Sequence, residues 1–322
     1  MAQSERNQDS QDKILLITGG CGFIGTNLVK YLADRGYQIR VLDNLSTGKE
    51  ENLRKFRRQD RGPSAVDLRV GDIRDRGEVS KAVKGTDAVV HLAAHTSVTD
   101  SLENPREDWE VNVNGTFNLL EACRQNGVTK FVFASSNAVV GEQAPPIDEL
   151  KIPKPLSPYG ASKLAGEALC SAYHHSFGLK TISLRFANCY GPYADDKTSV
   201  IPRFIKWAKE EKPLIIYGDG NQTRDFVHVN DVCQAIYLAL TAAQPSTMEL
   251  YGSVFQIGTG TEVSINELAE LIKEMAGNKI QISYEPERKG EIKRNYSDIT
   301  KARTVLNFEP KVKLREGLHD LL

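Results

Sequence analysis

Residues 13–25 read KILLITGGCGFIG, and this stretch decides the fold. An apolar run leads directly into three glycines spaced three apart, Gly19, Gly22 and Gly25. Glycines let the backbone turn tightly between a strand and a helix, approach a pyrophosphate closely and direct that anion at the helix N-terminus. We therefore predict a dinucleotide-binding turn, with Phe23 and Ile24 at the start of the helix.

The alternation of strand and helix continues through the first half of the chain. Apolar, β-branched runs are separated by helical segments, and these runs lie at residues 37–42, 66–70, 87–94, 130–136 and 180–186. Continuous apolar strands separated by helices are typical of a parallel sheet that is covered on both faces. We predict an α/β fold with a doubly wound parallel sheet of the Rossmann type, which binds ligands at the carboxyl ends of its strands.

The pattern becomes irregular after about residue 188, where loops rich in Gly, Pro and Asp appear. We predict a cofactor-binding domain over residues 13–188 and a smaller α/β substrate-binding domain over most of residues 189–322. Two apolar segments between residues 226 and 258, FVHV and VFQIG, are expected to return to the main sheet. The polar residues 1–12 are expected to form a disordered tail.

The charge balance of the chain excludes some classes of partner. Its 322 residues include 41 Lys and Arg against 42 Asp and Glu, a net charge of −1, which gives no electrostatic basis for binding nucleic acid or an anionic membrane. No apolar run approaches the roughly 18 residues of a membrane span, so we expect a cytoplasmic protein. The 5 cysteines are scattered, which predicts neither disulfides nor a metal site.

An acidic residue at the end of the second strand indicates which dinucleotide binds. Asp43 lies 18 residues beyond Gly25, close to the position where a carboxylate accepts hydrogen bonds from the adenosine ribose, with Asn44 beside it. A carboxylate there repels a 2′-phosphate, which favours NAD over NADP. The alternative is that Asp43 is a simple turn former.

Two further segments at strand ends are expected near the cofactor. Asp72 and Ile73, after the third strand, are predicted to flank the adenine. Small side chains follow the fourth strand and are predicted to lie beside the cofactor, at Leu92, Ala93 and Ala94.

Tyr159 and Lys163 are four residues apart at the start of a predicted helix, so their side chains share one helix face. A phenol has a reference pKa of about 10, and an adjacent ammonium ion lowers that pKa by stabilising the phenolate. The pair is therefore a candidate proton-transfer device, although the same spacing also arises by chance in many helices.

The order of motifs along the chain resembles a known family. The motifs are TGGCGFIG at 18–25, VNVNGT at 111–116, SSNAVVG at 135–141, YGASK at 159–163, LRFANCYGP at 184–192, GDGNQTRDFVHVND at 218–231 and RKGE at 288–291. From about residue 13 to its end, the chain is similar to extended short-chain dehydrogenase/reductases of the NAD-dependent nucleotide-sugar epimerase/dehydratase family, and most of all to their UDP-glucose 4-epimerases.

The resemblance implies roles for several residues. Ser136 matches the catalytic hydroxyl, Tyr159 the base, and Lys163 the residue that orients the nicotinamide ribose. Asn112 matches an asparagine that organises the site near the cofactor, and the alternative for it is a brace within a helix. The family has three positions that contact the pyrophosphate of the sugar nucleotide, and they correspond here to Asn188, Arg224 and Arg288.

The implied reaction is 4-epimerisation of a UDP-sugar. Tyr159 would take the proton of the sugar 4-hydroxyl while C4 passes a hydride to NAD⁺, and the keto sugar would turn and recover the hydride on its other face. Related 4,6-dehydratases carry an Asp-Glu pair after the catalytic hydroxyl, whereas this chain has Asn137 and Ala138, which argues against elimination.

The identity of the sugar stays open. Asn295 stands where the family gates the pocket around C2, and its intermediate size leaves plain and N-acetylated hexoses possible. Lys293 and Arg294 leave a hexuronic acid possible, although surface charges are the favoured interpretation. A one-way nucleotide-sugar dehydrogenase or reductase and a non-catalytic dinucleotide sensor are the competing functions. By resemblance, a homodimer is expected through helices near residues 105–125 and 158–177.

Overall fold

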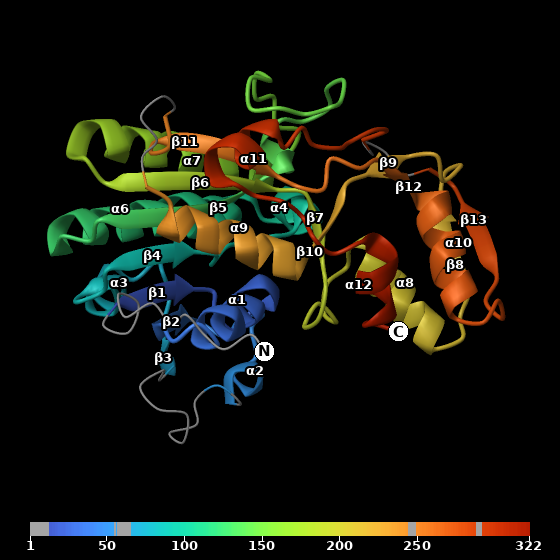
Figure 1. Cartoon of the computed structure of the whole chain (residues 1–322), viewed down its shortest axis with the longest axis horizontal. Coiled ribbons are helices and arrows are strands. Elements are labelled where there is room, and N and C mark those ends of the chain that lie inside the picture. The colour runs from blue at the N-terminus through green and yellow to red at the C-terminus, as the bar shows by residue number, and fades with distance from the viewer. Residues whose placement is uncertain (1–12, 55, 57–65, 244–248, 288–291) are drawn as a thin grey trace.

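The computed structural model describes residues 13–54, 56, 66–243, 249–287 and 292–322. The predicted tail at residues 1–12 and Arg288 lie outside the described residues. Figure 1 shows a large α/β body and a smaller lobe beside it, which holds α8, α10, α12, β8 and β13.

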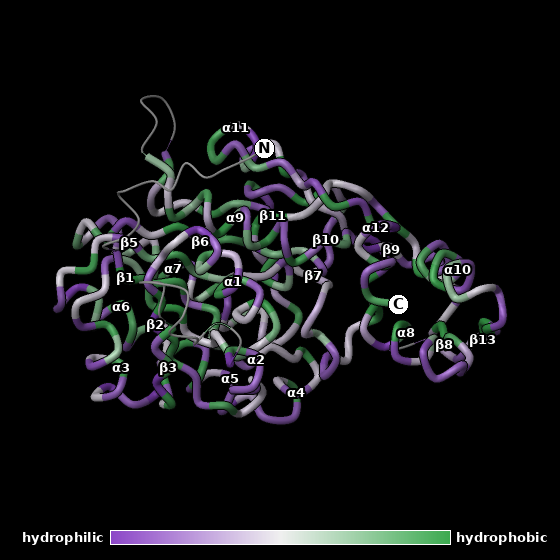
Figure 2. The backbone as a smooth tube through the Cα atoms, turned by 60° about the horizontal axis from the view of Figure 1, so that its bottom comes forward, coloured by the Kyte–Doolittle hydropathy of each residue, from purple (hydrophilic) through white to green (hydrophobic). Residues whose placement is uncertain are grey.

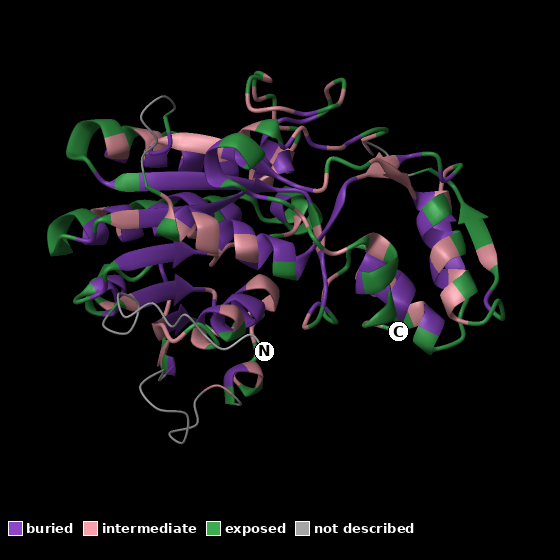
Figure 3. Cartoon of the chain, in the orientation of Figure 1, coloured by how far each residue is buried: buried purple, intermediate pink, exposed green. Residues whose placement is uncertain are grey.

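A seven-stranded parallel sheet forms the centre of the large body, in the order β11-β6-β5-β4-β1-β2-β3. Its strands are β1 (Ile14–Thr18), β2 (Gln38–Asp43), β3 (Val66–Val70), β4 (Ala88–His91), β5 (Lys130–Ser136), β6 (Lys180–Phe186) and β11 (Ser253–Ile257). The six strands predicted up to residue 186 are confirmed. Most residues of β1, β2, β4, β5 and β6 are buried (Figure 3), as expected for a sheet covered on both faces, whereas the edge strand β3 is only partly buried.

Helices cover both faces of this sheet. One face packs against α1 (Phe23–Ala33), α2 (Glu51–Arg54), α9 (Val229–Thr241) and α11 (Thr300–Leu306), and the other packs against α3 (Arg76–Val83), α6 (Gly115–Asn126) and α7 (Pro158–Phe177). Alternate strand residues contribute to the two cores: Leu15 and Ile17 face the first group, and Leu16 faces the second. The fold is therefore the doubly wound Rossmann type predicted from the sequence.

The two apolar segments expected to return to the sheet behave differently. The segment VFQIG forms β11, which pairs in parallel with β6 at the sheet edge. The segment FVHV does not enter the main sheet, so that expectation is wrong. It forms β10 (Phe226–His228), which pairs with β7 (Asn188–Tyr190) just beyond the end of β6, and the chain then turns directly into α9.

The smaller lobe has a core of its own, which includes Phe204, Leu268 and Leu318. Its elements are α8 (Val200–Lys209), β8 (Leu214–Tyr217), α10 (Ile265–Met275), β13 (Ile282–Glu285) and α12 (Leu314–His319). Between the lobes, β9 (Thr223–Arg224) pairs with β12 (Val263–Ser264). Hydrophobic and hydrophilic stretches alternate along the helices of both parts (Figure 2).

The segment between β4 and α6 begins with a loop and continues as three short helical pieces. They are α4 (Val98–Glu103), α5 (Pro105–Trp109) and a π-helical turn over Glu110–Asn114 that runs into α6. The widened turn places Asn112 and Val113 in the interior. Such single π-turns inside helices are frequent at functional sites.

Candidate active site

The N-terminus of α7 places Tyr159 beside the end of β5. Ser157 caps the helix, because its Oγ accepts a hydrogen bond from the backbone N–H of Gly160 at 3.1 Å. A side chain at Gly160 would meet the carbonyl oxygen of Ala138 at 2.5 Å, so only glycine allows this close approach. The first turn of α7 therefore lies directly against the short 3₁₀ turn Asn137–Val139 that follows Ser136.

Ser136 and Tyr159 are hydrogen-bonded through their side chains. The Oγ of Ser136 also accepts from the backbone N–H of Ala138 at 3.2 Å, which leaves its own O–H free to donate to the phenol oxygen. Burial raises the pKa of Tyr159 to about 12, and the hydrogen bond from Ser136 opposes that rise. The serine therefore stabilises the phenolate form.

Lys163 is 4% exposed and lies one turn beyond Tyr159. Its Nζ donates to the carbonyl oxygen of Ala134 at 3.0 Å and lies 5.9 Å from the centre of the Tyr159 ring. Burial lowers the pKa of Lys163 to about 8. The sequence-based expectation that Lys163 lowers the pKa of Tyr159 is not met in the protein alone, because burial of the phenol dominates and the ammonium group is directed at Ala134.

Asn112 is a brace within the protein. Its Oδ1 accepts from the backbone N–H of His95 at 2.8 Å. Its Nδ2 lies 3.0 Å from three acceptors: His95 O, Asp108 Oδ1 and Ser162 Oγ. The amide thus ties the loop after β4 to α7, and the alternative stated for Asn112, a structural brace, describes these contacts. A direct cofactor contact of Asn112 stays a prediction.

The glycine turn is closely packed at Gly19 and Gly25 but not at Gly22. Gly19 has a φ of +69°, and a Cβ on it would meet the backbone nitrogen of Ala93 at 2.7 Å. A Cβ on Gly25 would meet Gly19 O at 2.1 Å, so α1 packs directly on the turn. A Cβ on Gly22 would make only an ordinary contact of 3.4 Å, so packing within the chain does not require glycine there. Gly22 caps α1 without a side-chain hydrogen bond, which leaves the helix N-terminus able to receive an anion.

Asp43 lies at the end of β2 and is connected to the glycine turn. Its Oδ2 accepts from Cys21 N at 2.9 Å, and its Oδ1 accepts from Leu45 N at 2.8 Å. A carboxylate has about four acceptor sites, so two hydrogen bonds leave capacity for ribose hydroxyls. The turn-forming role proposed as the alternative is present, and binding of the ribose stays a prediction.

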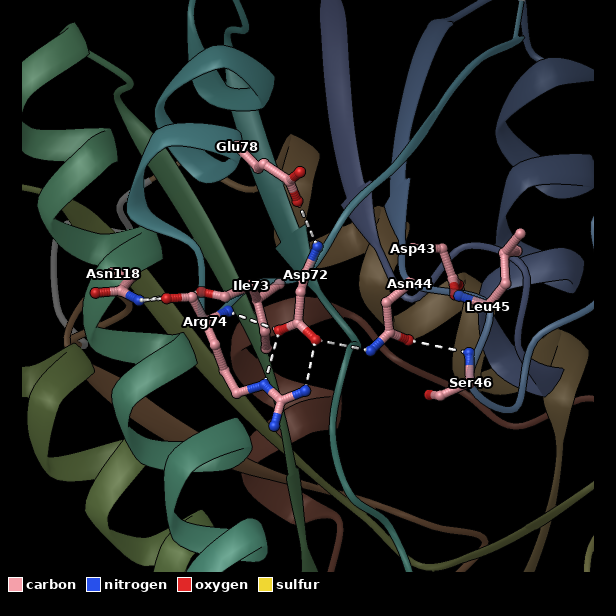
Figure 4. A network of polar contacts seen from close by, with 9 residues as sticks. All are labelled: Asp43, Asn44, Leu45, Ser46, Asp72, Ile73, Arg74, Glu78 and Asn118. Carbon is pink, nitrogen blue, oxygen red and sulfur yellow. Dashed lines mark hydrogen bonds and ion pairs between the residues drawn. The ribbon is translucent and has the colours of Figure 1, made fainter.

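A polar network joins the ends of β2 and β3 (Figure 4). Asn44 Nδ2 donates to Asp72 Oδ2 at 3.0 Å, and Arg74 binds Asp72 with both Nε and Nη2 at 3.0 and 2.8 Å. The hydrogen bonds from Arg74 lower the pKa of Asp72 to about 2. The backbone oxygen of the adjacent Ile73 accepts from Asn118 at 3.1 Å. The structure thus brings together three residues predicted near the adenosine, Asn44, Asp72 and Ile73.

The loop after β4 is held to the glycine turn by a buried chain of hydrogen bonds. Leu92 N donates to Thr18 O and Ala93 N to Thr18 Oγ1, each at 3.2 Å, and Ala94 follows them. Thr18 Oγ1 lies 2.8 Å from His91 Nδ1, and His91 Nε2 lies 2.9 Å from Thr116 Oγ1. Because Thr116 donates to Asn112 O, His91 must carry its proton on Nε2.

The predicted substrate residues lie where the two lobes meet. Asn188 begins β7 and is exposed, and its backbone N–H donates to Asp225 O at 3.0 Å. The Nη1 of Arg224, in β9, donates to Thr223 O and Ile292 O, each at 2.8 Å. Arg224 also makes further contacts within the chain.

Asn295 lies beside the residue that follows Ser136. The Nδ2 of Asn137 is 3.5 Å from Asn295 Oδ1 and 3.1 Å from Ser297 Oγ, and all three side chains are buried. Asp225 holds this segment in place by accepting from Ser297 N at 3.2 Å. The side chain of Asn137 therefore joins the predicted pocket residue Asn295 to the turn that follows Ser136, although the two residues are far apart in sequence.

Three buried charged residues near the site were missed from the sequence. Glu167 and Arg185 form an ion pair behind Ser135, and Asp108 lies one turn before Asn112. Helical spacing was the available signal, because Glu167 is four residues after Lys163 and Asp108 is four residues before Asn112.

No described helix is both long and apolar enough to cross a membrane.

Comparisons with known proteins agree with this geometry. Residues 15–258 match the model of the NAD dependent epimerase/dehydratase family. The crystal structure of UDP-glucose 4-epimerase with UDP-glucose from Thermotoga maritima is similar to the chain at a TM-score of 0.87 and 37% identity, with 95% of this chain and 96% of that chain covered. The UDP-glucose 4-epimerase of Thermus thermophilus in complex with NAD has a TM-score of 0.85 and 37% identity, with 95% and 96% covered. The UDP-glucuronate 4-epimerase of Thermodesulfobacterium geofontis is 35% identical, with 94% of this chain and 93% of that protein covered.

Proposed function

The chain belongs to the NAD-dependent epimerase/dehydratase family, and from that premise we propose that it interconverts the C4 epimers of a UDP-hexose. Its cofactor is NAD. The observation that carries the proposal is the contact between Ser136 and Tyr159, with buried Lys163 one turn away, at the carboxyl end of β5.

Tyr159 and Ser136 have different roles in the proton transfer. Tyr159, as the phenolate, removes the proton of the sugar 4-hydroxyl and later returns a proton to the same oxygen. Ser136 donates a hydrogen bond to the phenol oxygen, which stabilises the negative charge on Tyr159 during the transfer. When bound, NAD supplies the reversible hydride acceptor for C4. In this proposal Lys163, a buried cation, orients the cofactor ribose once NAD is bound.

The residues after Ser136 support an epimerase over a dehydratase. Elimination of water from the sugar needs a proton donor at the leaving hydroxyl, and Asn137 and Ala138 provide no acid there. The amide of Asn137 is held by Ser297 Oγ at 3.1 Å. The reaction therefore stops at reversible oxidation and reduction of C4.

The charges near the pocket support a neutral sugar. Arg294 binds Glu262 through Nε and Nη2, each at 2.7 Å, and Lys293 forms an ion pair with Glu287. Because both cations already have carboxylate partners, neither is available to bind the carboxylate of a hexuronic acid without breaking an existing pair. We propose UDP-glucose and UDP-galactose as the substrate pair, with N-acetylated hexoses as the next candidates at Asn295.

The nucleotide diphosphate is assigned to the junction of the two lobes. Arg224 and Asn188 lie there, and Arg288 would complete the set. Guanidinium groups bind phosphate oxygens with two parallel hydrogen bonds, which suits a diphosphate anchor about which the keto sugar can turn. Local arginines also explain how a chain with a net charge of −1 holds a polyanion.

We also propose a homodimer through the helices that follow β4 and β5. Large apolar side chains are exposed there, namely Leu102 at 62%, Trp109 at 51%, Phe117 at 45% and Phe177 at 55%. They belong to α4, α5, α6 and α7, which include the segments predicted to pair. Such an exposed apolar set is typical of an interaction surface.

The test is to incubate the NAD-loaded protein separately with UDP-glucose, UDP-N-acetylglucosamine and UDP-glucuronate, and to separate the products by chromatography. We expect UDP-galactose from UDP-glucose without net formation of NADH. Stoichiometric consumption of NAD would instead identify a dehydrogenase, and epimerisation of UDP-glucuronate alone would identify the hexuronate enzyme.

A further inference from the structure

A buried carboxylate lies beside the catalytic helix and takes no part in the steps above. Asp108, near the end of α5, is 1% exposed. Its Oδ1 is 3.0 Å from Asn112 Nδ2, whereas its Oδ2 has no hydrogen-bond partner among the described residues. Aspartates are rarely buried to this extent without a paired group, because the charge loses its hydration.

Asp108 is connected to the catalytic helix by a clamp that consists of Asn112 and Ser162. Ser162 Oγ donates its single proton to Tyr159 O at 3.0 Å, so it must accept from Asn112 Nδ2, also at 3.0 Å. The second N–H of the same amide faces Asp108 Oδ1 and His95 O. The carboxylate therefore helps to orient the amide that holds the first turn of α7.

The ionisable groups around Asp108 are few. On α7, Tyr159 and Lys163 interact with it electrostatically. From the loop after β4 it faces His95, whose Nδ1 is 3.7 Å from Asp108 Oδ1. Acidic residues on α4, α5 and the π-helical turn lie at or near the surface and are Asp100, Glu103, Glu107 and Glu110.

Two electrostatic effects follow from this arrangement. The negative charge of Asp108 raises the pKa of Lys163, which opposes the larger lowering caused by burial and favours the charged ammonium form. The same charge adds to the burial that raises the pKa of Tyr159. One carboxylate thus acts on both members of the pair.

We propose that Asp108 is a positioning residue of this active site, which orients the Asn112–Ser162 clamp and supplies the buried negative charge that faces Tyr159 and Lys163. It touches none of the reacting atoms. The inference rests on the proposed role of Tyr159 as the base, and it does not depend on which sugar is bound.

The test measures the ionisation of Tyr159 without any substrate. In the NAD-loaded protein, the near-ultraviolet phenolate absorbance of each variant is recorded against pH, and the same curve from a partner carrying Tyr159→Phe is subtracted. Asp108→Asn keeps an acceptor for Asn112 but removes the charge, so we expect the Tyr159 midpoint to fall by roughly half a pH unit or more. Glu107→Gln removes an exposed charge from the same helix and should leave the midpoint unchanged.

An unchanged or higher midpoint in Asp108→Asn, with native thermal stability, would overturn the proposal. If that variant does not fold, Asp108→Ser removes the charge and leaves room for a water, and it carries the same expected shift. Because the titration needs no turnover, it remains informative even if no UDP-sugar is epimerised, and failure of the proposed function is seen separately in the product assay.

Discussion

Lys163 donates a hydrogen bond from Nζ to the backbone oxygen of Ala134, 3.0 Å away, and this contact attaches the catalytic helix to the strand that ends in Ser136. The contact is one of three at successive helical turns, because Tyr159 meets Ser136 and Glu167 meets Ser135. Gly166 allows this closeness, since a Cβ there would meet the Phe133 ring at 2.3 Å. The position of the base therefore depends on docking of the whole helix.

Replacing Tyr159 with phenylalanine removes only the phenol oxygen. We expect kcat to fall by about 10² to 10⁴, the usual contribution of a general base, with little change in KM. Initial rates of epimer formation measure this, and the NAD content of the purified variant serves as the control for folding. A variant within about twofold of the parent would remove Tyr159 from the mechanism.

The buried pair of Glu167 and Arg185 predicts a large loss of stability in Glu167→Gln. Arg185 binds Glu167 with Nε at 2.8 Å and Nη2 at 2.7 Å, and both side chains are at most 5% exposed. Removing one partner leaves an uncompensated buried charge, which costs about 3–5 kcal/mol of unfolding free energy. The matched control is Glu274→Gln, whose exposed pair with Arg315 contributes under about 1 kcal/mol. Equal losses in urea unfolding would contradict this assignment.

Gly22→Ala and Gly25→Ala separate packing from cofactor binding. The added methyl group at Gly25 would meet Gly19 O at 2.1 Å, so that variant is expected to be destabilised. At Gly22 the nearest contact is an ordinary 3.4 Å, so this variant should fold normally but bind NAD at least about tenfold more weakly. Isothermal titration of the NAD-free protein gives both affinities. Normal NAD binding by Gly22→Ala would exclude a close approach of the pyrophosphate there.

His91 predicts a loss of stability in acid. Burial, with a smaller contribution from the Lys163 charge, lowers its pKa well below the ordinary value of 6.5. The unfolded chain therefore binds a proton that the folded chain excludes, so the stability is fully present above pH 6.5 and falls below it by up to about 1.4 kcal/mol per pH unit. His91→Gln keeps a donor and an acceptor but does not titrate, so the difference between the two proteins in urea unfolding should vary with pH below 6.5.

The proposed dimer is tested at Trp109, which is 51% exposed on α5. Trp109→Glu places a charge on the apolar surface and should shift sedimentation from dimer to monomer. Ile152→Glu is the matched control, because Ile152 is 71% exposed in the loop before α7 and lies outside the proposed interface. A parent protein that sediments as a monomer would contradict the dimer directly.

The sequence predicted the sheet well because its strands are continuous apolar runs, and observed bounds such as Lys130–Ser136 coincide with the predicted ones. The sequence motifs also predicted that Ser136, Tyr159 and Lys163 belong to one site. The strand partner of FVHV was predicted wrongly because a three-residue strand can pair with any nearby strand edge. Here it pairs with β7. The burial of Asp108 and the direction of the Lys163 side chain depend on how α5 and α7 pack. Local sequence patterns do not reveal that packing.

The order of the strands has a consequence for synthesis of the chain. β6 ends at Phe186, but its outer neighbour β11 begins only at Ser253, after α8, β8 and α9 have been made. A ribosome therefore exposes an unpaired strand edge next to the catalytic region for more than sixty residues of elongation. Such edges readily pair with other chains, so premature termination in this interval is expected to yield aggregates instead of a smaller working enzyme.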